Sequence, residues 1–138
     1  MDDMIATLRA VPLFSSLKDK ELQAILEISK EVALEAGHTI VEQDGSAIGF
    51  HLLLEGQADI EISGRHVSTF GPGDYFGEVS LLDGKPRTAT VITKTPTRAL
   101  VIPSWSFNTL LDMHPAIAKE LLLMLCARLR SAESLITA

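Results

Sequence analysis

This sequence is poor in cysteine and has no long apolar run, and each scarcity excludes a class of protein. Its one cysteine, Cys126, rules out an intramolecular disulfide and a cysteine-rich metal or iron–sulfur site. The longest apolar run, Leu121 to Ala127, falls far short of the roughly 20 residues that a membrane helix needs. The N-terminus is acidic at Asp2 and Asp3, where a secretory signal would be basic. We therefore expect a cytoplasmic protein without a membrane partner, in which Cys126 is a buried, small apolar side chain.

Basic residues are also few. Lysine and arginine number 12 against 18 aspartates and glutamates, which gives a net charge of −6, and the basic residues are scattered along the chain. A nucleic acid would need a basic stripe or patch, so we expect no nucleic-acid binding by this chain alone. The four histidines are dispersed, and no catalytic Ser/His/Asp or Cys/His arrangement is legible. We expect neither a metal site nor an enzyme.

The length of 138 residues, 46% of them hydrophobic, suits one core, so we expect a single domain over residues 1–138. Residues 1–30 follow a helical pattern that Pro12 interrupts. Ser16 is suited to cap a second helix, with Asp19 three positions on as its partner in a variant of the capping box. This zone therefore predicts N-terminal helices.

Residues 31–103 change character, because all nine glycines lie between Gly37 and Gly84. Such spacing predicts short strands joined by tight turns, and strict alternation is clearest from Gln57 to Ile62. Short strands at this spacing favour a sandwich or a jelly-roll barrel over a parallel sheet. The other candidate strands are His38–Val41, Phe50–Leu54, Val67–Phe70, Thr88–Thr93 and Ala99–Ile102.

Residues 104–138 return to helix, with one segment from Ser104 to about Met113 and another starting at Pro115. In the last helix, apolar residues recur alternately four and three positions apart, which is a heptad seam and predicts a homodimer through this helix. The alternative is a helix buried against its own domain; Leu121 and Met124, beside the seam, are expected to face the strands. The seam residues are Ala118, Leu122, Leu125, Leu129, Ala132 and Ile136.

The chemistry concentrates in Phe76 to Val91, FGEVSLLDGKPRTATV. Gly77 opens a short helical stretch, where backbone N–H groups can approach an anion closely. Arg87 follows a turn and can add a planar fork to the same anion, for which phosphate is the best match. Glu78 would then accept hydrogen bonds from a hydroxyl of a sugar phosphate. The alternative is a structural ion pair between Glu78 and Arg87.

This segment resembles the phosphate-binding cassette of cyclic nucleotide-binding domains, a family that includes the catabolite activator protein, kinase regulatory subunits and cyclic-nucleotide-gated channels. The resemblance extends over the chain, through VPLFSSL at residues 11–17, GPGDYFGE at residues 71–78 and the helix break at His114-Pro115. It implies an α+β, mainly β fold: an eight-stranded jelly-roll β-barrel with N-terminal helices and two C-terminal helices. No DNA-binding domain is expected within this chain.

The resemblance also implies roles for the cassette residues. Glu78 would bind the ribose 2′-hydroxyl, and Arg87 would pair with the exocyclic oxygens of the cyclic phosphate. Thr88 would add its amide and hydroxyl. The remaining lining residues would be Gly77, Val79, Ser80 and Ala89.

The last helix normally covers the base in this family, which puts Arg128 near the lid. Arg128 can stack on the base, or it is an ordinary solvated helix residue. A threonine after the arginine resembles domains that contact the guanine amino group, but cAMP-binding members also carry it, so Thr88 does not decide the base. We favour cAMP as the ligand by a small margin, with cGMP possible.

The mechanism implied is an allosteric switch in which nucleotide binding draws the cassette inward and the C-terminal helices close over it. Leu81 and Leu82 are candidates for the apolar link to the hinge, opposite Phe107 and Leu110. The alternatives are the sensor half of a catabolite activator-type transcription regulator, and a regulatory module of a channel, kinase or other effector. Trp105 is expected to pack under the hinge.

Overall fold

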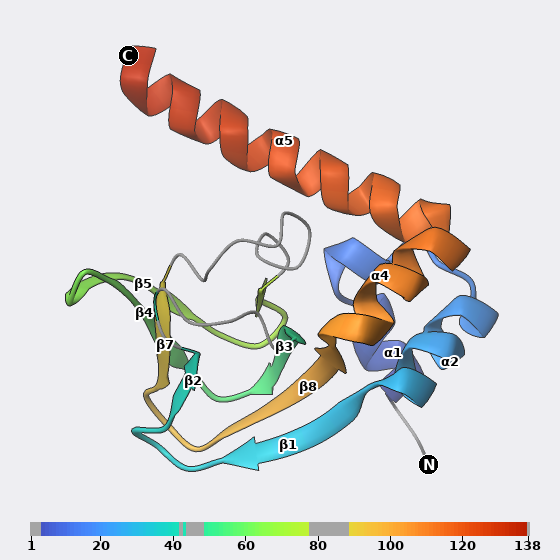
Figure 1. Ribbon diagram of the computed structural model, residues 1–138, viewed down its shortest axis with the longest axis horizontal. Coiled ribbons are helices and arrows are strands. Elements are labelled where there is room, and N and C mark those ends of the chain that lie inside the picture. Colours follow the sequence, from blue (N-terminus) through green and yellow to red (C-terminus); the bar gives the residue numbers. More distant parts are fainter. Residues whose placement is uncertain (1–3, 42, 44–48, 78–88, 138) are drawn as a thin grey trace.

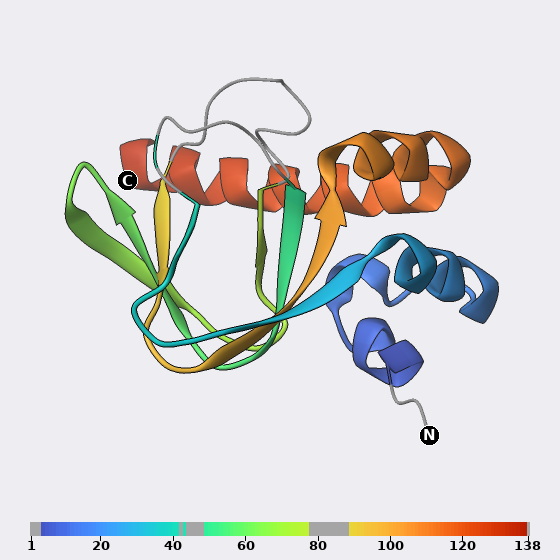
Figure 2. The same cartoon turned by 60° about the horizontal axis from the view of Figure 1, so that its bottom comes forward.

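Helices gather at both ends of the chain, as predicted. The computed structural model describes residues 4–41, 43, 49–77 and 89–137, and for residues 134–137 the backbone alone. In both overall views α5 leaves the cluster of shorter helices and extends past the strands (Figures 1 and 2). The helices are α1 (Met4–Arg9), the 3-10 helix η1 (Pro12–Phe14), α2 (Asp19–Ile28), α4 (Ser104–Met113) and α5 (Pro115–Thr137).

The described strands number eight, all paired antiparallel, in two four-stranded sheets. The first sheet has the order β1-β8-β3-β6 and the second β2-β7-β4-β5. The eight strands flanked by helices confirm the predicted fold class, but the strands described here stay in two separate sheets and form no closed barrel. Their bounds are β1 (Lys30–Leu34), β2 (Thr39–Val41), β3 (Gly49–Glu55), β4 (Ala58–Ile62), β5 (Arg65–Phe70), β6 (Tyr75–Phe76), β7 (Thr90–Thr93) and β8 (Thr97–Pro103).

Two hydrophobic cores lie on opposite faces of the first sheet. The sheet core, between the two sheets, includes Leu53 of β3 and Phe76 of β6. The helix-side core joins the other face to the helices and includes Leu52 and Tyr75, one residue before each. Successive side chains of a strand point to opposite faces, so each of these two strands serves both cores. The short strand β6 thereby connects the cores directly before the predicted cassette.

The predicted strands are confirmed within two residues at each described end, whereas β1 and β6 were missed. In β1 only Val32 and Leu34 are partly buried, because the strand pairs with β8 alone at the edge of its sheet. β6 is two residues long, too short for a pattern to show. The start of the predicted strand at Thr88 lies outside the described residues; β7 begins at Thr90.

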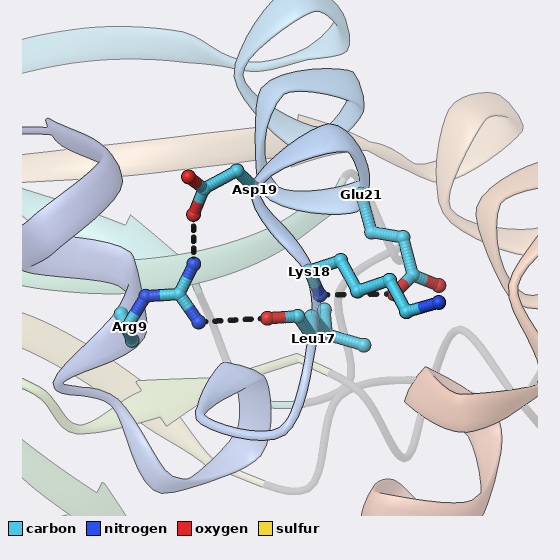
Figure 3. A network of polar contacts seen from close by, with 5 residues as sticks. All are labelled: Arg9, Leu17, Lys18, Asp19 and Glu21. Atoms are coloured by element: carbon cyan, nitrogen blue, oxygen red, sulfur yellow. Dashed lines mark hydrogen bonds and ion pairs between the residues drawn. The ribbon is translucent and has the colours of Figure 1, made fainter.

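The start of α2 corrects the predicted cap at Ser16. The helix begins at Asp19, and the backbone N–H of Lys18 donates to Glu21 Oε1 at 3.0 Å (Figure 3). Arg9 donates to the backbone oxygen of Leu17 at 2.8 Å and pairs with the carboxylate of Asp19 (Figure 3). A carboxylate three positions into the helix thus satisfies the first N–H, and Arg9 fixes α1 against this turn.

Two predictions of burial are wrong. Cys126 is exposed, and the side chain of Trp105 is 75% exposed. Trp105 lies two positions before Phe107, which is about 200° around a helix, and Phe107 is the residue that packs into the core. In α5 the buried side is marked by Leu121, as predicted, and Cys126 projects from a different face. Both predictions assumed that a hydrophobic residue on a helix is buried, but the sequence does not show which face of the helix packs against the core.

None of the described helices is long and apolar enough to cross a membrane.

Candidate functional site

The predicted site is only partly contained in the described residues. Gly77, Ala89 and Arg128 are described, whereas Glu78, Val79, Ser80, Arg87 and Thr88 lie outside the described residues, as do Leu81 and Leu82. The described part comprises both ends of the cassette and the helix predicted to cover it.

Gly77 follows β6 directly and has a φ of +101°. That backbone conformation is rarely adopted by residues with a side chain, because their Cβ meets the neighbouring carbonyl. The entrance to the cassette therefore requires glycine at this position. The short helical stretch that Gly77 was predicted to open lies outside the described residues.

Ala89 stands at the other end, one residue before β7, and is partly buried against the sheet core. Thr90, the first residue of β7, accepts a hydrogen bond at its Oγ1 from the backbone N–H of Gln43, at 2.9 Å. Gly77 follows β6 of the first sheet and Ala89 precedes β7 of the second, so the two ends of the cassette adjoin different sheets.

Aromatic side chains pack together inside the protein next to Gly77. Phe76 pairs with His51 of β3, and the two rings are stacked with centroids 4.8 Å apart and planes 4° from parallel. Phe70 of β5 lies against the same phenyl ring at 6.1 Å. His51 and Phe76 are both buried, at 6% and 8% exposure. The burial of His51 was not predicted from the sequence. It could have been, because residues two apart in a strand share a face and Leu53 is an apolar residue of the same strand.

Arg128 of α5 lines a pocket of about 310 Å³ between α5 and the turn before β6. Its guanidinium carbon is 5.7 Å from the centre of the Tyr75 ring, within the range of a cation–π contact. Tyr75 is buried, at 8% exposure. Asp74 closes the turn before β6, because its carboxylate accepts the N–H of Gly71 at 2.8 Å. The pocket is lined by Pro12, Phe70, Gly73, Asp74, Tyr75, Met124, Ala127 and Arg128.

The hinge between α4 and α5 is held to the N-terminal helices. His114 ends α4, and its Nδ1 lies 3.3 Å from Oε2 of Glu21 in the first turn of α2. Phe107 and Leu110 of α4 are buried in the helix-side core, which agrees with their predicted place at the hinge. Their predicted contact with Leu81 and Leu82 falls outside the described residues.

The described histidines, cysteine and carboxylates include no group of three that could hold a metal ion.

A family model and curated proteins both match this chain, and their descriptions agree with each other. A family model described as "Cyclic nucleotide-binding domain" matches residues 31–114. The chain is 38% identical over 108 residues to the cAMP-dependent protein kinase regulatory subunit of Aspergillus niger, and 38% over 109 residues to that of Aspergillus fumigatus. Each alignment covers 77% of this chain and 26% of the relative, so the chain spans about a quarter of the length of these curated relatives.

Solved structures agree. The catabolite activator protein of Thermus thermophilus superposes with a TM-score of 0.83 at 28% identity, over 91% of this chain and 61% of that one. The N-terminal domain of a transcriptional regulator from Streptomyces coelicolor A3(2) superposes with a TM-score of 0.74 at 30% identity, over 99% and 96%.

The match of the family model begins in β1 and ends at His114, and it therefore includes both sheets, the cassette segment and α4. It covers well over half of the chain. The resemblance inferred from the cassette residues is confirmed: this chain belongs to the cyclic nucleotide-binding domain family.

Proposed function

We propose that this chain is a non-catalytic sensor domain that binds a cyclic nucleotide, with cAMP as the preferred ligand and cGMP as the alternative. The observation that carries the proposal is the segment Phe76 to Val91, which keeps both Glu78 and Arg87 in a chain of this family. The left-handed backbone at Gly77 supports it, since a glycine there lets the chain approach a phosphate closely.

The roles proposed for these residues are those that the family resemblance implies, and the chemistry of each group suits its role. Arg87 offers two parallel N–H donors to the exocyclic phosphate oxygens. The carboxylate of Glu78 accepts from the ribose 2′-hydroxyl. Thr88 adds its amide and hydroxyl to the phosphate. The backbone around this set is that of Gly77, Val79, Ser80 and Ala89.

The preference for cAMP draws support from the relatives. The fungal proteins at 38% identity are named as regulatory subunits of cAMP-dependent protein kinases. Arg128 lines the pocket from α5, where a guanidinium can stack on a purine base.

Binding would act as a switch through the C-terminal helices. The two ends of the cassette adjoin different sheets, and α4 and α5 meet at His114, so closure of α5 over the ligand requires a change at this hinge. Nucleotide drives that change only to the extent that it binds the closed arrangement more tightly.

The exposed seam of α5 supports a homodimer. Leu122 is 62% exposed and Leu129 is 60% exposed, so the single chain leaves these two seam residues uncovered. This disfavours the alternative in which the seam packs on its own domain. The similarity to the Thermus and Streptomyces structures favours, as a second function, the sensor part of a transcription regulator.

A thermal-shift comparison of cAMP, cGMP and 5′-AMP tests the proposal, because a ligand that binds only the folded state raises the melting temperature. We expect a concentration-dependent rise of several degrees with cAMP, a smaller rise with cGMP and none with 5′-AMP, which lacks the cyclic phosphate. No rise with either cyclic nucleotide at millimolar concentration would reject the proposal.

A further inference from the structure

Three aromatic rings and one guanidinium form a continuous stack from α4 to α5. Phe107 of α4 is stacked on Phe50 of β3, with centroids 5.2 Å apart and planes at 12°. Phe50 is stacked in turn on Tyr75 of β6, at 5.3 Å and 28°. The guanidinium of Arg128 on α5 lies over the Tyr75 ring at 5.7 Å. The stack therefore joins the two C-terminal helices through the first sheet.

The Tyr75 ring is held rigidly in this stack. Phe50 and Phe107 are 1% and 2% exposed, and the edge of Phe14 meets the Phe50 ring at 6.4 Å. Tyr75 also pairs with Leu52 in the sheet ladder. A close-packed ring in such a position has little freedom to move, so it offers a fixed platform.

Arg128 lies on the exposed part of α5. A long arginine side chain has many rotamers, and contact with the face of a fixed aromatic ring favours those that keep the guanidinium over the ring. Tyr75 and Arg128 both line the pocket under α5, so that region is part of the pocket wall.

Tyr75 also lies two positions before Gly77, at the entrance to the cassette. Within β6, Phe76 points into the sheet core and Tyr75 into the helix-side core. The strand that leads into the cassette therefore carries, on its other face, the ring that holds the cation of α5.

We propose that Tyr75 is a positioning residue for nucleotide binding: it holds the guanidinium of Arg128 in the lining of the pocket between α5 and β6, so that α5 presents a preoriented cation to the ligand. This inference rests on the proposed function. A group that is already ordered loses less conformational entropy when the ligand binds, which raises affinity.

The test is a double-mutant cycle, with cAMP affinity measured by isothermal titration calorimetry on the full chain. Tyr75→Phe keeps the ring and should bind within twofold of the wild type. Tyr75→Leu and Arg128→Met should each weaken binding about threefold to tenfold. The double variant should bind no more weakly than Arg128→Met alone, because the ring acts only through the guanidinium.

Arg130→Met is the matched control, since it removes an exposed arginine from the same helix. Because Arg128 is at the surface, Arg128→Met folds and tests the guanidinium on which the inference depends; urea unfolding of Tyr75→Leu shows that its affinity is read on folded protein. A wild-type chain that binds neither cyclic nucleotide would reject the proposed function. A wild-type chain that binds cAMP, with Arg128→Met binding equally well or with additive losses in the cycle, would overturn this inference alone.

Discussion

The imidazole of His114, in the break between α4 and α5, contacts the carboxylate of Glu21 in the first turn of α2, with Nδ1 and Oε2 3.3 Å apart. Both side chains are largely buried, at 19% and 23% exposure. The same carboxylate accepts the N–H of Lys18 through its other oxygen. One side chain therefore starts an N-terminal helix and holds the hinge of the C-terminal pair.

Glu21→Gln should reduce the stability of the protein in a pH-dependent way. The N–H of Lys18, with help from His114, outweighs burial and holds the pKa of Glu21 below its ordinary value of 4.5. A lowered pKa means that the carboxylate stabilises the fold above pH 4.5, and that this contribution is lost as the pH falls through the folded-state pKa. We expect a loss of about 1 kcal/mol in the free energy of unfolding at pH 7.

Urea unfolding at pH 7 and pH 3 measures this difference between wild type and variant, which should shrink at the lower pH. Glu27→Gln, an exposed residue of the same helix, is the control and should behave as the wild type. A difference that is equal at both pH values would contradict the role assigned to the ionised carboxylate.

Gly77→Ala should destabilise the protein by about 1–3 kcal/mol, because the φ of +101° is strained for a residue with a Cβ. Urea unfolding gives the loss directly. Gly71→Ala is the matched control: an added Cβ there meets nothing within 4 Å and the backbone is not left-handed. Equal stability of the two variants would argue against a required glycine at the cassette entrance.

Arg87→Leu should lower cAMP affinity on the order of 100-fold, because a charge-assisted, bidentate phosphate contact is lost. Arg65→Leu removes the same charge from an exposed position of β5 and should leave affinity within about twofold. Calorimetry on both variants separates a specific contact from the general effect of net charge. Unchanged binding by Arg87→Leu would leave Arg87 without its assigned role and favour the structural ion pair with Glu78.

Leu122→Glu together with Leu129→Glu should convert the expected dimer into a monomer in sedimentation velocity, since charges would face each other across the seam. Leu123→Glu is the control, because Leu123 is 53% exposed but lies off the seam. If the wild-type chain sediments as a monomer with and without cAMP, the predicted dimer is wrong.

The prolines of the sequence defined the bounds of α4 and the start of α5 well. Pro103-Ser104 and His114-Pro115 mark the ends of α4, and the structure has the helix from Ser104 to Met113 as predicted. The bounds were readable because proline restricts the backbone locally. The edge strand β1 was missed because its burial is slight: Val32 and Leu34 are only partly buried, and the apolar Ala33 between them hides the alternation in the sequence.

Contacts between residues far apart in the chain could not be predicted from the sequence pattern. Nothing local relates Tyr75 to Arg128 or Glu21 to His114, because these pairs form only when helices dock on the sheet. The same limit explains Trp105, whose residue type suggested burial although α4 docks through Phe107 and Leu110. The ligand roles of Glu78, Arg87 and Thr88 remain predictions from the cassette sequence.

The exposure of Cys126 has a practical consequence. It is the chain's one thiol, it projects from the helix proposed to close over the ligand, and it lies two positions before Arg128. A nitroxide or fluorophore attached there would label each chain at a single defined position, without any cysteine having to be removed or added. A label at Cys126 would therefore report movement of α5 when the ligand binds, and in a dimer it would report the distance between the two α5 helices.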